Sequence, residues 1–246
     1  MKLYIAGDGP RETELRALCT LRGHTLPEHG PWDVAVLPLP RSTIAQDLAD
    51  LLPNGQLVVC GHTDERFDDL ASHRGWRLMR VLQDEAYTVE NAALTAEGAV
   101  CAAMNACPFA IGRSRCLVIG YGRIGKQLTR LLRGLGALVT VTARREESRM
   151  EAGPNSISIP KIPSVLPETD LIFNTVPALI LDRDALKSVS PAARIIELAS
   201  KPYGIDMDAA RELGLNVMVE SGVPGRYCPQ SAAVTLLDYM ERNEST

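Results

Sequence analysis

The chain alternates short apolar runs with stretches whose apolar positions recur at helical spacing. The apolar run at 116–119 leads into a glycine-rich turn, and an amphipathic stretch extends from Lys126 to Leu135. Gly134-Leu135-Gly136 then separates this stretch from a second apolar run at 138–142. A continuous apolar run of this length is typical of a buried strand, and 3.6-residue periodicity is typical of a helix. The segment therefore predicts a strand–helix–strand unit with parallel strands.

The first third of the chain has the same alternation. We predict strands at 3–6, 33–38, 56–60 and 76–81, separated by helices at 11–22, 43–52 and 64–74. Strands that alternate with crossover helices form a parallel sheet. This part is expected to be a small α/β domain with its own sheet.

The second half continues the pattern. Further strands are predicted at 156–159, 170–177, 193–198 and 216–219, and a final helix from Pro229 to Arg242. The fold class is therefore α/β, with two Rossmann-like parallel-sheet domains separated by a cleft and connected by long helices. The expected division is a substrate-side domain at 1–94, which the C-terminal helix at 229–246 could join, a connecting helix at 95–112 with Thr95 as its N-cap, and a dinucleotide-binding domain at 113–228.

The glycine-rich turn is the first sign of chemistry. It reads Gly120-Tyr121-Gly122-Arg123-Ile124-Gly125, a GxGxxG between a predicted strand and a predicted helix. Glycines permit the tight turn and the close approach of backbone to a pyrophosphate, whose charge then lies at a helix N-terminus. This context predicts a dinucleotide site.

The residues after the second strand of this unit bear on the choice of dinucleotide. An acidic residue about 20 positions after the motif normally binds the ribose hydroxyls of NAD. This chain instead has Arg144, 24 positions after Gly120, followed by Arg145. A guanidinium there suits a 2′-phosphate, which favours NADP while leaving NAD possible. The alternative is a pair of solvated arginines at a strand end.

Composition and charge narrow the partners. The 246 residues carry 26 basic and 30 acidic side chains, a net charge of −4, and no basic stretch suggests nucleic-acid binding. No segment approaches the ~20 apolar residues of a membrane span, and residues 1–7 resemble a strand more than a signal peptide, so a cytoplasmic location is expected. The six cysteines lack CxxC pairing and the four histidines lack metal-ligand spacing, so we expect no metal site.

Polar residues follow two later strands, where ligands of parallel sheets bind. The strand at 170–177 ends in Asn174-Thr175-Val176-Pro177, which we expect to contact the ribose or nicotinamide. The strand at 193–198 is followed by Ala199-Ser200-Lys201-Pro202, which brings Lys201 toward the same crevice.

Several motifs together resemble the family of dipicolinate synthase A subunits. They are the glycine-rich turn, Phe173 to Ala178, Leu198 to Gly204, Gly222 to Pro229, and Thr95-Ala96-Glu97-Gly98. The resemblance extends from about Asp84 to the C-terminus, and the first 80 residues match less well.

The resemblance implies an NADP-dependent dehydrogenase that oxidises dihydrodipicolinate, or its hydroxy-tetrahydro precursor, to dipicolinate. This reaction branches from the lysine pathway in the mother cell of a sporulating bacterium. The resemblance also implies a partner, the flavoprotein-like B subunit of dipicolinate synthase, and apolar helix faces permit a homo-oligomer. Gain of aromaticity favours the reaction, so the protein mainly positions its reactants.

A dicarboxylate substrate requires cationic partners or helix N-termini. The substrate-binding candidates are Arg226, Thr95, Ser200 and His62, and the catalytic candidates are Lys201, Glu97 and Glu220. Either glutamate could act as acid or base if water must first be lost. The structural alternatives are a solvated loop arginine or lysine, a helix cap at Thr95, a first-turn acid at Glu97 and an exposed loop histidine at His62.

Two other functions fit the sequence. The strand-end Asn-Thr-x-Pro is also similar to shikimate-dehydrogenase-like enzymes, although the first domain offers no convincing lysine and aspartate pair for that chemistry. A non-catalytic NADP-binding subunit is the third possibility. NADP binding without turnover would favour it.

Overall fold

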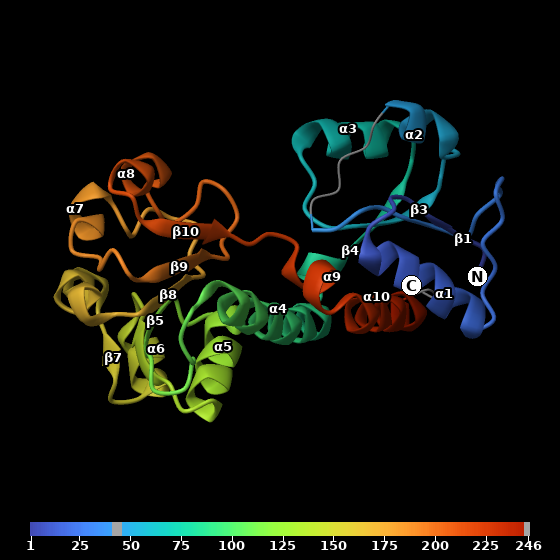
Figure 1. Ribbon diagram of the computed structural model, residues 1–246. Coiled ribbons are helices and arrows are strands. Elements are labelled where there is room, and N and C mark those ends of the chain that lie inside the picture. The colour runs from blue at the N-terminus through green and yellow to red at the C-terminus, as the bar shows by residue number, and fades with distance from the viewer. Residues whose placement is uncertain (41–45, 244–246) are drawn as a thin grey trace. The chain divides into compact units, whose positions relative to one another are not determined.

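The computed structural model describes residues 1–40 and 46–243, which form two compact units (Figure 1). The first unit contains Met1–Leu94 and Pro224–Thr246, and the second contains Thr95–Val223. The chain thus leaves the first unit within one helix and returns to it near residue 224. Each unit contains its own parallel sheet, which confirms the predicted fold class.

The sheet of the first unit has four parallel strands in the order β1-β2-β3-β4. The strands are β1 (Leu3–Ile5), β2 (Val34–Val36), β3 (Leu57–Cys60) and β4 (Arg77–Arg80). The helices between them are α1 (Pro10–Leu21), α2 (Gln46–Leu51) and α3 (Glu65–His73), and the short 3-10 helix η1 (Val81–Gln83) follows β4. The predicted strands and helices are therefore present, except that residues 43–45 of the predicted helix at 43–52 lie outside the described residues.

Side chains alternate along each strand, and each face of this sheet is covered by its own hydrophobic cluster. Leu3, Ile5 and Val34 pack on one side with Leu15 of α1 and with Leu236 of the last helix. The opposite face carries the second cluster, formed by Ala35, Leu37, Val58 and Cys60 with Phe67 and Trp76. This two-sided packing explains why the strands are nearly all apolar.

The last helix, α10 (Pro229–Asn243), packs against α1 in the first unit. The short helix α9 (Val223–Tyr227) precedes it. At the end of α1, Arg22 donates hydrogen bonds to Asp238 (2.6 Å) and Glu241 (2.7 Å). Two segments at opposite ends of the sequence thus form one layer.

The connecting helix was predicted at 95–112, but the structure has the long helix α4 (Glu85–Ala106) instead. The helix begins ten residues earlier than predicted, and the Asp84 carboxylate accepts a hydrogen bond from the Tyr87 amide (2.7 Å), as an N-cap does. Thr95 therefore lies in the middle of α4 and is not its N-cap. The helix ends before Cys107-Pro108, since a proline cannot continue it.

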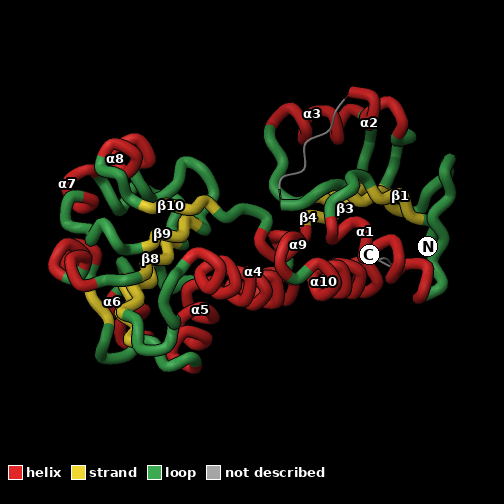
Figure 2. Tube along the Cα trace, viewed as in Figure 1, coloured by secondary structure: helices red, strands yellow, loops and turns green. Residues whose placement is uncertain are grey.

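The second unit has a six-stranded parallel sheet in the order β10-β9-β8-β5-β6-β7. Its neighbouring strands β8, β9 and β10 are labelled in Figure 2. The strands are β5 (Arg115–Ile119), β6 (Leu138–Thr142), β7 (Ser156–Ile157), β8 (Leu171–Asn174), β9 (Arg194–Glu197) and β10 (Asn216–Val219). Helices α5 (Arg123–Gly134), α6 (Glu146–Ala152), α7 (Arg183–Leu186) and α8 (Met207–Glu212) connect them, with 3-10 helices η2 (Ile159–Ser164) and η3 (Leu166–Glu168). The strand order reverses between β5 and β8, where dinucleotides bind in sheets of this topology.

Candidate cofactor and substrate site

The glycine-rich turn lies at this reversal point. Gly120 directly follows β5 and has φ +99°, a conformation that other residues rarely adopt. A Cβ at Gly120 would contact the Thr175 hydroxyl and lie 2.7 Å from Cγ2 of Val176, and one at Gly125 would overlap the Gly120 carbonyl. Both glycines are therefore required by packing within the protein.

Gly122 differs because a Cβ there would meet no atom within 4 Å. This residue is the N-cap of α5 and provides no side-chain hydrogen bond to the first turn. The first amides of a helix lack partners within the helix and attract anions. Open space beside an uncapped helix start fits a dinucleotide pyrophosphate.

The other residues of the turn surround this opening. Tyr121 is half-buried, and its ring lies 5.5 Å from Nζ of Lys126, which forms an ion pair with Glu151 (2.7 Å). Ile124 is half-buried and Arg123 is exposed.

The Arg144–Arg145 pair follows β6, the strand beside β5. Both side chains are exposed and have no hydrogen bond or ion pair with the residues that the structure describes. Beneath them, Nη1 of Arg149 donates to the carbonyls of Ala143 (3.0 Å) and Arg144 (2.8 Å). Arg149 thus fixes the backbone of the loop while the two preceding guanidiniums stay available to a ligand.

Asn174 ends β8 fully buried, and its amide is used inside the protein. Nδ2 lies 2.8 Å and 2.9 Å from the two carboxylate oxygens of Glu197 and 3.0 Å from the Val176 carbonyl. Oδ1 accepts from the Val176 amide (3.2 Å). Asn174 therefore holds the turn after β8, and this contact leaves its predicted ribose or nicotinamide contact a hypothesis.

Glu197 is a functional candidate that sequence reasoning missed. Besides Asn174, its carboxylate accepts hydrogen bonds from the amides of Ala199 (2.8 Å) and Gly204 (3.0 Å). Burial raises the pKa of Glu197, while the hydrogen bonds from Asn174, Ala199 and Gly204 oppose that rise. The available signal was an acidic residue inside a predicted buried strand, where an unpaired carboxylate is costly.

Thr175, Val176 and Pro177 form the edge facing the glycine-rich turn. The Thr175 hydroxyl donates to the Ile119 carbonyl (2.8 Å) and packs against Gly120. Thr175 and Val176 are half-buried and Pro177 is exposed.

Ser200 and Lys201 lie in the loop that Glu197 holds at both ends. Both side chains are exposed, and Nζ of Lys201 lies 6.0 Å from the centre of the Tyr203 ring. The loop follows β9, on the same sheet edge as the turn after β8. The structure thus brings these two predicted segments together through Glu197.

The remaining predicted residues have mixed surroundings. Thr95 is buried and Glu97 is exposed, and both lie inside α4. Neither residue is therefore at the start of a helix, as was predicted for them. Glu220 is buried after β10, and its amide donates to the Glu197 carbonyl (2.8 Å). All three lie in the second unit.

Arg226 and His62 belong to the first unit. Arg226 is exposed in α9, and its guanidinium lies 5.3 Å from the Tyr227 ring centre. His62 is exposed after β3, and its amide donates to the Pro40 carbonyl (2.9 Å).

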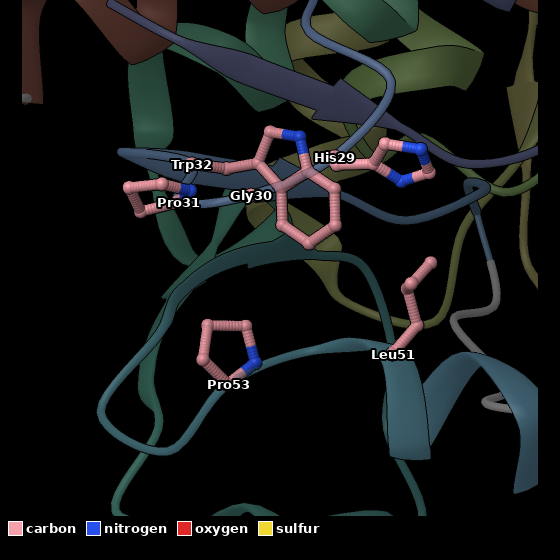
Figure 3. Close-up of a pocket in the computed structure, with 6 residues that line it drawn as sticks. All are labelled: His29, Gly30, Pro31, Trp32, Leu51 and Pro53. Atoms are coloured by element: carbon pink, nitrogen blue, oxygen red, sulfur yellow. The ribbon is translucent and has the colours of Figure 1, made fainter.

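The first unit also contains an apolar pocket of about 380 Å³ (Figure 3). Trp32 and Pro53 precede β2 and β3, so the pocket lies at the amino-terminal edge of the sheet, away from the edge where ligands of parallel sheets bind. Nε1 of Trp32 donates to the Pro27 carbonyl (3.0 Å). The pocket is lined by His29, Gly30, Pro31, Trp32, Leu51 and Pro53.

Membrane spans and metal clusters are both absent from the described residues. No helix within 1–40 or 46–243 is long and apolar enough to cross a membrane. In the same residues, no three His, Cys, Asp or Glu side chains are grouped as metal ligands would be.

Residues 85–202 match a known family, described as the NAD binding domain of D-isomer specific 2-hydroxyacid dehydrogenases. The matched segment contains the glycine-rich turn, the arginine pair, Asn174, Glu197 and Lys201. The match supports a nicotinamide cofactor and an oxidoreductase type of domain. It does not distinguish NADP from NAD.

The chain is also 27% identical over 202 residues to the dipicolinate synthase A subunit of Bacillus subtilis (strain 168). This alignment covers 81% of the chain and 68% of the relative. The resemblance that the motifs indicated is therefore confirmed.

Solved structures show the same fold. The dipicolinate synthase A subunit from Bacillus halodurans superposes with a TM-score of 0.86 at 24% identity, covering 100% of this chain and 98% of the other. The apo-structure of D-lactate dehydrogenase from Escherichia coli has a TM-score of 0.64 at 16% identity, with coverage of 98% and 97%.

Proposed function

From this similarity, we propose that the chain acts as a dipicolinate synthase A subunit, oxidising dihydrodipicolinate or its hydroxy-tetrahydro precursor to dipicolinate. The observation that supports the proposal most strongly is the 27% identity to the Bacillus subtilis protein over 81% of the chain. Dihydrodipicolinate and NADP⁺ give dipicolinate, NADPH and a proton. If the substrate is the hydroxylated form, water leaves first.

NADP supplies the hydride acceptor when it is bound. The substrate gains aromaticity on losing hydride and a proton, so the protein's task is to orient and desolvate the reactants. The opening beside Gly122 and the uncapped start of α5 suit the pyrophosphate. Thr175, Val176 and Pro177 form the adjoining edge at the end of β8, where we assign the nicotinamide ribose.

We assign the 2′-phosphate of NADP to Arg144 and Arg145. Both guanidiniums are exposed beside β6 and are not engaged by the described residues. Arg149 holds the loop backbone in place, so less conformational freedom is lost when a phosphate binds. Phosphate suits the planar fork of arginine well.

The substrate's carboxylates require charge-assisted hydrogen bonds. Lys201 and Ser200 come from the loop fixed by Glu197, and Arg226 is the strongest candidate in the first unit. Thr95 and His62 remain weaker candidates for substrate contact. Glu220, buried after β10, and Glu97 are the candidates for moving a proton during loss of water.

The relative's name designates one of at least two different polypeptides of that enzyme. We propose that this chain also has a partner polypeptide, a flavoprotein-like B subunit of dipicolinate synthase. A homo-oligomer of the chain is a separate proposal, consistent with its exposed apolar side chains such as Leu21 and Met150.

The test is dipicolinate formation, detected as its terbium complex. The full chain receives the product of dihydrodipicolinate synthase with NADP or NAD, with and without the flavoprotein-like partner. Reactions lacking the chain correct for spontaneous oxidation of the intermediate. Product above this background, and more with NADP than with NAD, is the expected result.

The outcomes separate the alternatives. NADP binding without product, even beside the flavoprotein-like partner, would favour a non-catalytic nucleotide-binding role. Oxidation of a hydroxylated ring acid without dipicolinate formation would favour the shikimate-dehydrogenase-like reaction.

A further inference from the structure

Arg11 is a charged residue buried in the first unit, only 7% exposed, at the start of α1. Its neighbour Glu12 is 8% exposed. Buried charges in proteins are almost always paired or bound to a ligand.

The three nitrogens of the Arg11 guanidinium differ in their hydrogen bonds. Nε and Nη2 both donate to Oε1 of Glu12, at 3.1 Å and 2.6 Å, and Nη2 also donates to the Leu39 carbonyl (3.1 Å). Nη1 makes no hydrogen bond with any residue in 1–40 or 46–243. Nη1 is also not among the fully buried side-chain polar atoms that lack a partner in these residues. Glu12 and Leu39 thus fix a guanidinium that presents one open donor group.

The location of Arg11 is where a parallel sheet binds ligands. The residue follows the loop Gly7-Asp8-Gly9 at the carboxyl end of β1, and Leu39 follows the carboxyl end of β2. Ligands of parallel sheets bind beyond the carboxyl ends of the strands. Arg11 is therefore at the binding edge of this sheet, unlike the apolar pocket of Figure 3, which lies at the amino-terminal edge.

A second segment approaches the same guanidinium. A Cβ at Gly225 would lie 3.5 Å from Cβ and 3.8 Å from Nη1 of Arg11. Gly225 directly precedes Arg226, and both belong to the first unit. The segment that carries the best substrate-binding candidate therefore packs against Arg11.

A purely structural ion pair explains this arrangement less well. Replacing a buried ion pair by apolar residues is often neutral or stabilising, so such a pair adds little net stability. Stability would also not require an open Nη1 at the ligand-binding edge.

We propose that Nη1 of Arg11 binds a carboxylate of the substrate, with Glu12 as the positioning residue that orients the guanidinium. The proposal extends the proposed function, since a ring dicarboxylate offers two such groups. The ligand chemistry is that of an aromatic or cyclic dicarboxylate. Hydrogen bonds to charged groups are strong enough to make one such contact a measurable part of the affinity.

The test compares three forms of the full chain: wild type, the double variant Arg11→Met/Glu12→Leu and the control Arg22→Met. Arg11→Met alone leaves Glu12 buried without its partner and could fail to fold, so the decisive form is Arg11→Met/Glu12→Leu, which removes both charges at similar volume. Arg22→Met, at the opposite end of α1, is the matched control because it removes a surface arginine. Dipicolinate binding is measured calorimetrically with and without NADP, NADP binding is measured separately, and KM is measured where turnover occurs.

We expect dipicolinate to bind the double variant roughly 10- to 150-fold more weakly than wild type, the factor for losing one hydrogen bond to a charged group. The double variant should bind NADP as tightly as wild type does, and the Arg22→Met control should bind dipicolinate as tightly as wild type does. Equal dipicolinate affinity in wild type and a folded double variant would overturn the role of Arg11 even if the wild type is active. Dipicolinate binding that depends on Arg11 in a chain without turnover would retain this role and reject the proposed reaction. A wild-type chain that binds no dipicolinate would overturn both.

Discussion

Asn174 and Glu197 are joined by a two-point contact between neighbouring parallel strands, with Nδ2 of the amide 2.8 Å and 2.9 Å from the two carboxylate oxygens. The Ala199 and Gly204 amides donate to the same carboxylate. This cluster ties the turn after β8 to both ends of the loop that carries Ser200 and Lys201. Its geometry makes Glu197 a positioning residue for the proposed nicotinamide and substrate contacts.

Glu197→Gln should weaken this cluster. A glutamine has one acceptor oxygen, so its amide nitrogen would face one of the donors now bound by the carboxylate. We expect a loss of about 1–3 kcal/mol in the free energy of unfolding, the range for an unsatisfied buried polar group, measured by urea denaturation. Glu168→Gln, an exposed control paired with Arg115, should change stability by less than about 0.5 kcal/mol. Equal effects of the two substitutions would remove the structural role assigned to Glu197.

The pKa of Glu197 predicts a pH dependence of stability. Burial raises this pKa in the folded protein, so the native chain holds the proton more tightly than the unfolded chain. Between the ordinary glutamate pKa and the raised value, the unfolded state binds fewer protons, and the free energy of unfolding falls as pH rises. Wild type should therefore lose stability relative to Glu197→Gln as pH rises through this window. Denaturation curves between about pH 4 and about pH 8 test this, and a constant difference between the two proteins would contradict it.

The glycine-rich turn gives a contrast between two alanine substitutions. Gly122→Ala places its Cβ in open space with φ −84°, so the fold should be retained while the pyrophosphate loses its close approach. Gly120→Ala requires φ +99° and contact with Thr175 and Val176, so it should destabilise the second unit. Thermal unfolding and NADPH fluorescence titration measure the two effects. Tight NADPH binding by a folded Gly122→Ala chain would place the pyrophosphate elsewhere.

The arginine pair predicts cofactor preference. Arg144→Ala/Arg145→Ala should weaken NADPH binding about tenfold or more and leave NADH affinity nearly unchanged, because only NADPH carries the 2′-phosphate. Arg130→Ala, exposed on α5, serves as the control for loss of a surface arginine. Parallel losses for both cofactors would show that the pair does not select the phosphate.

The N-cap of α4 predicts different effects at Asp84 and Thr95. Asp84→Ala removes the hydrogen bond to the Tyr87 amide and should cost about 1 kcal/mol of stability. Thr95→Ala should cost no capping energy, since Thr95 lies inside the helix. A fall in substrate affinity for Thr95→Ala would support its proposed substrate contact. An intact NADP affinity in the same variant would confine that effect to the substrate.

The sequence predicted elements with strong local signals best. The strand at 216–219 and the glycine-rich turn were located correctly because an apolar run bounded by glycines and charged residues specifies each of them locally. The start of α4 was wrong because Thr95 is a good local cap, while Asp84 is also one and precedes an unbroken helical stretch. Local preference alone does not choose between two caps on the same helix.

The sequence predicted the site less completely because contacts between distant positions decide it. Asn174 was expected to face the cofactor, and the expectation did not include a carboxylate 23 positions later that binds its amide. Arg11 was overlooked because an arginine near a helix start resembles a solvated side chain until burial is known. Both residues gain their importance from parallel strands that bring distant loops to one edge.

The packing of α10 on α1 has a consequence during translation. Leu3 and Leu15 share their hydrophobic cluster with Ala233, Leu236 and Leu237, so this layer needs the first and the last helices of the described chain. The ribosome releases those last residues after all of Thr95–Val223 has been made. The second unit is therefore fully synthesised before α10 becomes available to complete the hydrophobic layer of the first unit.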